Sequence, residues 1–414
     1  MKSLKLFLEQ FLKSKGQFVF LSLLLGKITA FLGSWLIIRM LPISEFGTLT
    51  IVASTFAIFS TFNGFGSQQS LLRFGSVSTE NLEKNNLAAY LFRKGLLYQI
   101  ILSLAFLLSS IFFINKFEDI FLVFIFFTIR LVGFYFFNHI QCYFRIQNEN
   151  GNFAKVNNYV NVFGLVLLVS LTYLFGFQGY LFSIAFTPFI SLFWLKKIPT
   201  KSLKINFSFT KKELFQYGIF ASATALLSDL MFSADVLLLG FILNDTAVAN
   251  YKVAILIPAN ITFLSLVFMQ TDFPKLAKNF KNKVFLKHYI INYYKIFLPV
   301  CTIIFLVGFY FDQQILSYFF GSKYGNNGWI FSILLFAFAF NMLSRNLYGN
   351  LLSAVGKIKV NSIVSFLSLI ILVILSFILV PKMLILGMAI SISVAMIFSG
   401  VFFAFLFYLY YRKL

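Results

Sequence analysis

Cysteine and histidine are scarce in this chain of 414 residues, which contains two of each. Cys142 and Cys301 are too few for a disulfide framework, and zinc sites are built mainly from cysteine and histidine, so we expect no disulfide network and no metal site. The sequence also lacks the phosphate-binding pattern G-x-x-x-x-G-K-[ST] and any hydrophilic stretch as long as a soluble domain. These absences argue against an ATPase or a soluble glycosyltransferase domain, and they leave no candidate catalytic residue and no cofactor.

Apolar residues dominate the composition. Hydrophobic side chains make up 60% of the chain, charged ones 11%, and the mean hydropathy is +0.88. A soluble fold could not hide this much apolar surface, whereas runs of about 20 apolar residues suffice to cross a bilayer core of about 30 Å. We therefore predict an all-α integral membrane protein of twelve transmembrane helices at 18–40, 47–66, 95–114, 119–138, 156–175, 177–195, 217–241, 247–270, 290–311, 328–350, 360–380 and 384–410.

The net charge of +21 is distributed along the chain in a way that predicts membrane topology and not nucleic-acid binding. Alternate inter-helix segments carry 25 of the 34 basic residues, and the opposite segments carry three, Lys116, Lys323 and Lys382. Cytoplasmic loops are enriched in Lys and Arg. We therefore expect a multi-pass membrane protein with both termini in the cytoplasm.

The longest hydrophilic stretch lies near the middle of the chain, at 196–216, and holds six lysines. It separates six predicted helices in 1–195 from six in 217–414. Two equal halves joined by a basic cytoplasmic linker are what a parallel duplication produces, as in several transporter folds. We therefore predict two six-helix bundles and a transporter.

Six basic residues fall inside predicted helices. A cation at the bilayer centre costs about 2.5–3.5 kcal/mol on insertion scales, so such residues usually face water, a ligand or a partner. Lys27 and Arg130 lie near the middle of their spans. The others, which lie within a turn or two of a membrane face and could extend their stems toward it, are Arg39, Lys252, Lys295 and Arg345. With only two deep acids opposing them, these cations favour an anionic substrate.

Two further observations on these helices leave alternatives open. Lys27 shares a face of small residues with Gly26 and Gly33, which predicts either a cavity or close helix packing. Asp229 and Asp235 are the deep carboxylates of the seventh span. We expect them to pair with a Lys or Arg of the other half, and the competing interpretation is a proton or sodium site.

Several segments resemble the polysaccharide repeat-unit flippases of the MOP superfamily, which also contains lipid II flippases and the MATE exporters. The resemblance covers nearly the whole chain, and the order and spacing of the segments carry it. These segments are Arg39–Gly47 and Gly66–Phe74 in the first half, then Asp235–Gly240, Tyr251, Pro274, Gly321–Tyr324, Leu351–Lys357 and Leu379–Ala389 in the second.

The resemblance implies a V-shaped, MATE-like fold that opens alternately to the two sides of the membrane. It also implies a cationic cavity, with Lys27 and Arg130 as the best candidates, that accepts an undecaprenyl-pyrophosphate-linked oligosaccharide such as an O-antigen repeat unit. Membrane lipids, a polysaccharide polymerase and a chain-length regulator would be its partners, and the membrane potential, H+ or Na+ would supply coupling.

Other functions are weighed against this one. A MATE-like small-molecule exporter would fit deep acids without a cationic excess, and the first helix lacks the acidic residue expected of many such exporters. A membrane polymerase would usually have a large outer loop, and an O-acyltransferase would have a histidine inside the membrane. A structural scaffold would not need cations at mid-span.

Overall fold

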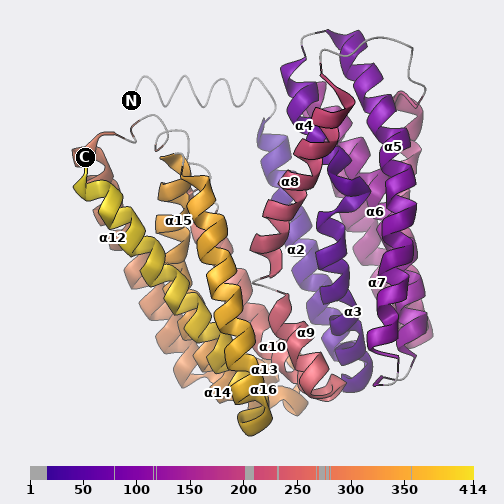
Figure 1. Cartoon of the computed structure of the whole chain (residues 1–414). Coiled ribbons are helices and arrows are strands. Elements are labelled where there is room, and N and C mark those ends of the chain that lie inside the picture. The colour runs from indigo at the N-terminus through magenta and orange to yellow at the C-terminus, as the bar shows by residue number, and fades with distance from the viewer. Residues whose placement is uncertain are drawn as a thin grey trace. The chain divides into compact units, whose positions relative to one another are not determined.

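A computed structural model gives the fold of the chain (Figure 1). It describes residues 16–414 except 79, 115, 118, 201–208, 231–232, 267, 270–275, 277–278, 280 and 356. Within these residues the regular elements are α-helices and short 3-10 helices, and no strand occurs. The predicted all-α membrane fold is therefore confirmed.

The chain divides into two compact units. Unit 1 runs to Pro42 and from Thr55 to Leu226, and unit 2 consists of Ile43–Ser54 and Leu227–Leu414. Unit 1 is built from α2 (Gly16–Met40), the end of α3 (Ile43–Thr61), η1 (Asn63–Gly66), α4 (Ser67–Val77), α5 (Asn81–Leu108), η2 (Ser109–Phe112), α6 (Ile120–Ile146), α7 (Asn150–Phe186), η3 (Thr187–Lys197) and most of α8 (Lys211–Leu230).

Unit 2 takes the beginning of α3 and the end of α8. Its other helices are α9 (Ala234–Ile242), α10 (Asp245–Ile261), α12 (Lys283–Tyr310), α13 (Asp312–Phe320), η4 (Ser322–Asn327), α14 (Gly328–Leu343), α15 (Arg345–Ala354) and α16 (Ile358–Arg412). The units depart from the division expected from sequence, because α8 begins inside the predicted linker and packs mainly in unit 1.

In the described part of the chain, nine helical segments have the length and apolarity needed to cross a membrane. Two of them, Asn150–Lys197 and Val360–Arg412, contain 48 and 53 residues. At 1.5 Å per residue each would extend about 70–80 Å, more than twice the bilayer core. Each therefore holds two crossings, which makes the protein multi-pass and matches the pairs of helices predicted there.

The chain reverses at one residue in each of these long segments. Gly176 in α7 has φ 58° and ψ −135°, and Leu384 in α16 has φ 52° and ψ −130°. Hydrogen bonds join the helices across both turns, from the Ser183 hydroxyl to the Leu167 carbonyl (3.0 Å) and from the Ser376 hydroxyl to the Met388 sulfur (3.4 Å). The two segments are thus antiparallel helix pairs.

The two turns share their local construction. Three residues after the reversal comes Gly179 in α7 and Gly387 in α16, and a Cβ at either would lie within 2.5 Å of the backbone carbonyl of Leu171 or Leu379. Four residues later a serine hydroxyl, Ser183 or Ser391, bonds back to the glycine carbonyl. Such matched turns in the two halves support the duplication inferred from the pattern of helices.

The second predicted helix is interrupted in the structure. Sequence predicts one span at 47–66 followed by a loop at 67–94, but α3 ends at Thr61 and α4 and α5 occupy most of that loop. Between α3 and α4, the residues Gly64, Phe65 and Gly66 each have a left-handed backbone conformation. The side-chain oxygen of Gln99 accepts the Gly64 N–H at 2.8 Å, so this buried backbone donor keeps a hydrogen bond.

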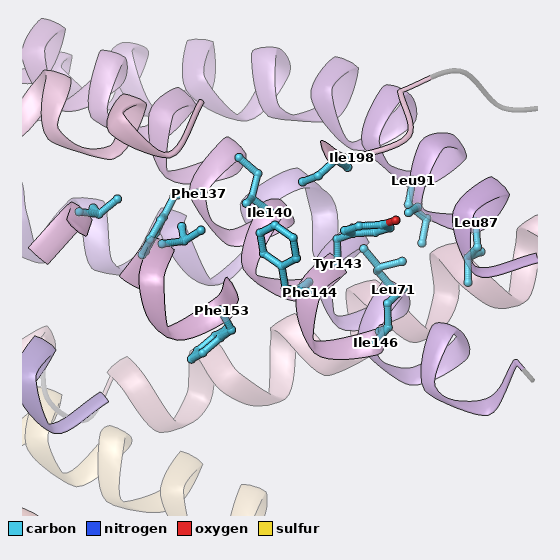
Figure 2. Packing of buried hydrophobic residues seen from close by; sticks show 14 of the residues in the cluster. Leu71, Leu87, Leu91, Phe137, Ile140, Tyr143, Phe144, Ile146, Phe153 and Ile198 are labelled. Carbon is cyan, nitrogen blue, oxygen red and sulfur yellow. The ribbon is translucent and has the colours of Figure 1, made fainter. Parts of the chain in front are cut away.

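A hydrophobic core explains why the predicted loop is helical. Leu71 of α4, Leu87 and Leu91 of α5, and Phe144 of α6 are buried in one cluster with Phe153 of α7 (Figure 2). The helices of unit 1 therefore remain packed together at the end where the basic residues gather. Cys142 and His139 of α6 are also buried in unit 1.

Candidate functional site

Arg130 lies in α6 with its guanidinium between aromatic rings. The guanidinium carbon is 5.0 Å from the ring centre of Phe56 on α3 and 5.6 Å from that of Phe127, one turn earlier on α6. Tyr180 of α7 interacts electrostatically with it. The side chain is half-buried, and its Nε is fully buried with no hydrogen-bond partner among the residues that the structure describes.

This arrangement suits recognition of an anion. Cation–π contacts with Phe56 and Phe127 fix the plane of the guanidinium without using its N–H groups. A guanidinium can then donate two parallel hydrogen bonds to a phosphate, and such charge-assisted bonds are about twice as strong as neutral ones. A cation held at mid-span with an unused donor is therefore the strongest candidate for substrate contact.

Lys27 lies on α2, and the small face predicted around it divides into two parts. Gly26 and Gly33 pack against α7, where a Cβ would meet Asn161 at 3.1 Å and Leu165 at 3.6 Å. The Lys27 side chain is exposed and does not share this contact. Close helix packing therefore explains the glycines, and the exposure of Lys27 leaves its role as a substrate contact a prediction.

Asp235 and Lys252 come together in unit 2. The hydroxyl of Tyr251 on α10 donates a 2.6 Å hydrogen bond to Oδ2 of Asp235, and the N–H of Val236 donates to Oδ1 at 2.8 Å. Lys252 interacts electrostatically with the same carboxylate. Asp235 is fully buried, so the bonds compensate its desolvation. Its partners come from the same half, and not from the other half as the sequence predicts.

Arg345 links α15 to both arms of α16. From the start of α15 it donates to the hydroxyls of Ser399 (3.3 Å) and Ser365 (3.2 Å), which belong to the two arms of α16. Its guanidinium also lies 5.9 Å from the ring centre of Phe403. These contacts give Arg345 a structural task in joining three helices.

The remaining predicted residues lie at exposed positions. Arg39 is at the end of α2 with its guanidinium 5.3 Å from the Trp35 ring centre, and Lys295 is exposed on α12. Asp229 is exposed near the end of α8. Of the predicted residues, Asp235 and Lys252 are brought together inside unit 2.

Sequence reasoning missed the aromatic and tyrosine partners. Phe127 precedes Arg130 by three positions, a spacing that puts both on one helix face, so this contact had a signal. Tyr251 adjoins Lys252 and belongs to a segment already singled out. Phe56 and Tyr180 had no signal, because they approach Arg130 from helices far away in the chain.

Comparisons with known proteins place the chain in a family. The model of the family described as polysaccharide biosynthesis protein matches residues 12–280. A capsular polysaccharide biosynthesis protein CapF of Staphylococcus aureus is 32% identical over 130 residues, which are 30% of this chain and 32% of CapF. A putative O-antigen transporter of Shigella flexneri is 23% identical over 54% of this chain and 53% of that protein. The matched regions thus span a third to a half of these relatives.

Solved structures agree on the fold. The lipid II flippase MurJ, in an inward closed conformation, matches with a TM-score of 0.70 at 14% identity, covering 94% of this chain and 86% of MurJ. A multidrug resistance MATE transporter of the MOP superfamily, in an inward-facing conformation, matches with a TM-score of 0.68 at 15% identity and covers 94% of both chains. Since the family model spans more than half of the sequence, the chain belongs to the polysaccharide biosynthesis protein family.

Proposed function

We propose that this protein is a flippase that moves undecaprenyl-pyrophosphate-linked oligosaccharide from the cytoplasmic to the outer leaflet of the bacterial inner membrane. It performs transport without covalent chemistry. The family, the O-antigen transporter among its relatives and the MurJ-like fold support this assignment. A surface-polysaccharide polymerase, with its chain-length regulator, would receive the translocated repeat unit.

One observation carries the proposal, which is the Arg130 site. A guanidinium at mid-span is held in place by two phenylalanine rings, and its Nε has no hydrogen-bond partner in the described part of the chain. The diphosphate of the lipid carrier is the part of the substrate that matches this donor set, because it offers paired anionic oxygens. Cationic drugs would be repelled from the same position.

Orientation and coupling complete the proposal. Both termini lie in the cytoplasm, as the positive-inside rule predicts from the 25-to-3 distribution of basic residues in loops. The membrane potential drives the anionic substrate outward. Asp235, buried beside Tyr251, is the group that a coupled H+ or Na+ would meet.

The test reconstitutes the protein in sealed vesicles that contain fluorescent undecaprenyl-pyrophosphate-linked oligosaccharide in the inner leaflet, and follows its appearance in the outer one. We expect Arg130→Ala to abolish transport and Arg130→Lys to slow it strongly, because lysine cannot make the bidentate contact. Wild-type protein that leaves the labelled lipid in its original leaflet would refute the proposal.

Arg145 gives the matched control. It lies on the same helix with its guanidinium 6.0 Å from the Phe153 ring centre, but its side chain is exposed. Arg145→Ala removes the same charge from α6, and we expect transport near the wild-type rate. Protein abundance is measured for every variant, since loss of protein in place of loss of transport would assign Arg130 to folding.

A second candidate, a small-molecule exporter of the MATE type, is favoured by the buried Asp235 with its tyrosine and lysine partners. This function predicts pH- or sodium-driven efflux of a fluorescent organic cation from the same vesicles. It also predicts that Asp235→Asn removes efflux of the cation. The flippase function predicts instead that Arg130→Ala removes lipid transport and that Arg145→Ala does not.

A further inference from the structure

A cavity of about 230 Å³ lies inside unit 1, and Arg130 is not among the described residues that line it. Its walls come from the break after α3, from α4 and α5, and from the beginning of α8. The chemistry-bearing residues among its lining are Ser67, Ser70, Tyr90, Lys94, Tyr98, Lys211 and Lys212. One water needs only about 10–15 Å³ of such volume, so the cavity has room for a much larger group.

The beginning of α8 is held firmly against α4 and α5. The Ser70 hydroxyl donates a 2.5 Å hydrogen bond to the carbonyl of Leu214, which is buried. The rings of Phe209 and Tyr217 pack on Phe74 at 4.6 Å and 5.5 Å between centres. These contacts on either side of Lys211 and Lys212 fix the two lysines at the wall of the cavity although their side chains are exposed.

The cavity carries positive charge from two directions. Lys94 comes from α5, and Lys211 and Lys212 come from α8. Lys211 Nζ lies 5.9 Å from the ring centre of Tyr90, which also lines the cavity. Three positively charged residues in the lining of one cavity favour an anion there.

Among the described residues that line the cavity there is no acidic one. The acid nearest in sequence is Glu213, whose Oε2 accepts the N–H of Thr210 at 2.8 Å and its hydroxyl at 2.9 Å. This pair forms a capping box at the start of α8, so the carboxylate serves the helix terminus. The other described residues of the lining are serines, tyrosines, glycines and apolar residues.

We infer that this cavity is a second binding site, for a phosphate group, at the end of unit 1 that the positive-inside rule assigns to the cytoplasm. Lysine ammonium groups bind phosphate as point charges, and hydroxyls supply hydrogen bonds. The ligand is a phosphate ester from one of two sources, the diphosphate of the lipid-linked substrate or a phospholipid headgroup. As the place where substrate is received before Arg130, the site rests on the proposed function.

Lysine footprinting tests the site without requiring transport. The wild-type protein, in phosphatidylcholine nanodiscs, is acylated with a water-soluble succinimidyl ester, and each lysine is quantified by mass spectrometry. One arm adds inorganic pyrophosphate, and a second replaces phosphatidylcholine by phosphatidylglycerol. At a ligand concentration about ten times the dissociation constant, we expect acylation of the three cavity lysines to fall about tenfold. The internal controls are the exposed lysines Lys155, Lys196 and Lys197.

Each outcome decides the inference. Selective protection by pyrophosphate supports the site and points to the substrate's diphosphate, and selective protection only by phosphatidylglycerol supports it with a phospholipid headgroup as ligand. Equal acylation of cavity and control lysines in both arms overturns it.

The vesicle assay gives a second test of the site. The combined substitutions Lys94→Gln, Lys211→Gln and Lys212→Gln should slow transport at limiting substrate, while Lys155→Gln, Lys196→Gln and Lys197→Gln together should not. If wild-type protein does not transport, the proposed function fails while the footprint still reports on the site.

Discussion

Tyr251 donates a hydrogen bond of 2.6 Å to Oδ2 of Asp235, and both side chains are fully buried. The bond ties α9 to α10 inside unit 2 and satisfies a carboxylate that has been removed from water and lipid. A buried acceptor that loses its partner costs about 1–3 kcal/mol, and more when it is charged.

We therefore expect Tyr251→Phe to lower the free energy of unfolding by about 1–3 kcal/mol. Thermal unfolding of the purified protein in detergent measures the effect. Tyr294→Phe is the control, because its hydroxyl meets another hydroxyl, that of Tyr348, at a longer 3.3 Å and is only partly buried. Equal melting temperatures of the Tyr251 and Tyr294 variants would show that the hydrogen bond to Asp235 stabilises the fold no more than the contact between Tyr294 and Tyr348.

The reversal at Leu384 gives a second prediction. Its φ of 52° and ψ of −130° suit glycine, and its side chain is 58% exposed. We expect Leu384→Gly to raise stability by about 1 kcal/mol, because relief of backbone strain exceeds the loss of an exposed side chain. Melting temperature again provides the measurement.

The equivalent position in α7 supplies the reciprocal change. Gly176 already has φ 58°, so Gly176→Ala should destabilise even though no atom lies within 4 Å of the new Cβ. Gly151→Ala is the matched control, with the same free space and no positive φ, and should be neutral or slightly stabilising. If both alanine variants melt alike, the backbone at residue 176 is not strained by a side chain.

Much of the fold could be predicted because lipid restricts the possibilities. Only helices satisfy their backbone hydrogen bonds alone, and each must cross about 30 Å, so helix positions follow from apolar runs. The reversals near 176 and 384 were also foreseeable, since a single helix of that length cannot fit one bilayer. Local length and hydropathy therefore predict the number of crossings well.

Breaks inside a span are harder to predict. Asn63-Gly64-Phe65-Gly66 contains the glycines that a left-handed turn needs, yet sequence continues the helix through it. Whether such a break is stable depends on Gln99, which accepts the Gly64 N–H from 35 positions away. The candidate site has the same limit, because Phe56 reaches Arg130 only through packing of separate helices.

A third prediction concerns the crossing of α8 over the break. A Cβ on Gly218 would lie 2.6 Å from the carbonyl oxygen of Gly66, and one on Gly66 would lie 2.1 Å from that of Gly218. Backbone atoms cannot move aside as a flexible side chain can. Gly218→Val should therefore separate α8 from the other helices of unit 1. We expect markedly faster proteolysis near Lys211 than in wild-type protein. Gly33→Ala, whose Cβ would be 3.6 Å from Leu165, should leave proteolysis unchanged.

The final prediction joins the charge at mid-span to the energy source. A diphosphate-linked lipid is anionic and the cell interior is electrically negative, so outward movement is favoured by about 2.3 kcal/mol per net charge for each 100 mV. This corresponds to roughly a fortyfold bias per charge in the distribution between leaflets. In the proposed function, Arg130 contacts the anion from a fixed place on α6 and does not leave with it, so we expect the charge of the substrate to remain uncancelled.

We therefore expect a potassium–valinomycin potential, positive outside, to accelerate transport of lipid-linked oligosaccharide in sealed vesicles, and its collapse to slow transport. Removing ATP at constant potential should change nothing, because the chain has no nucleotide-binding motif. The control omits the protein, so that leakage of labelled lipid under the same potential is subtracted. A rate that is independent of potential would mean that a counter-ion crosses with the substrate and compensates its charge. A companion measurement with a pH or sodium gradient would then identify this ion. Asp235, which is buried in unit 2, is the first residue to substitute in that experiment.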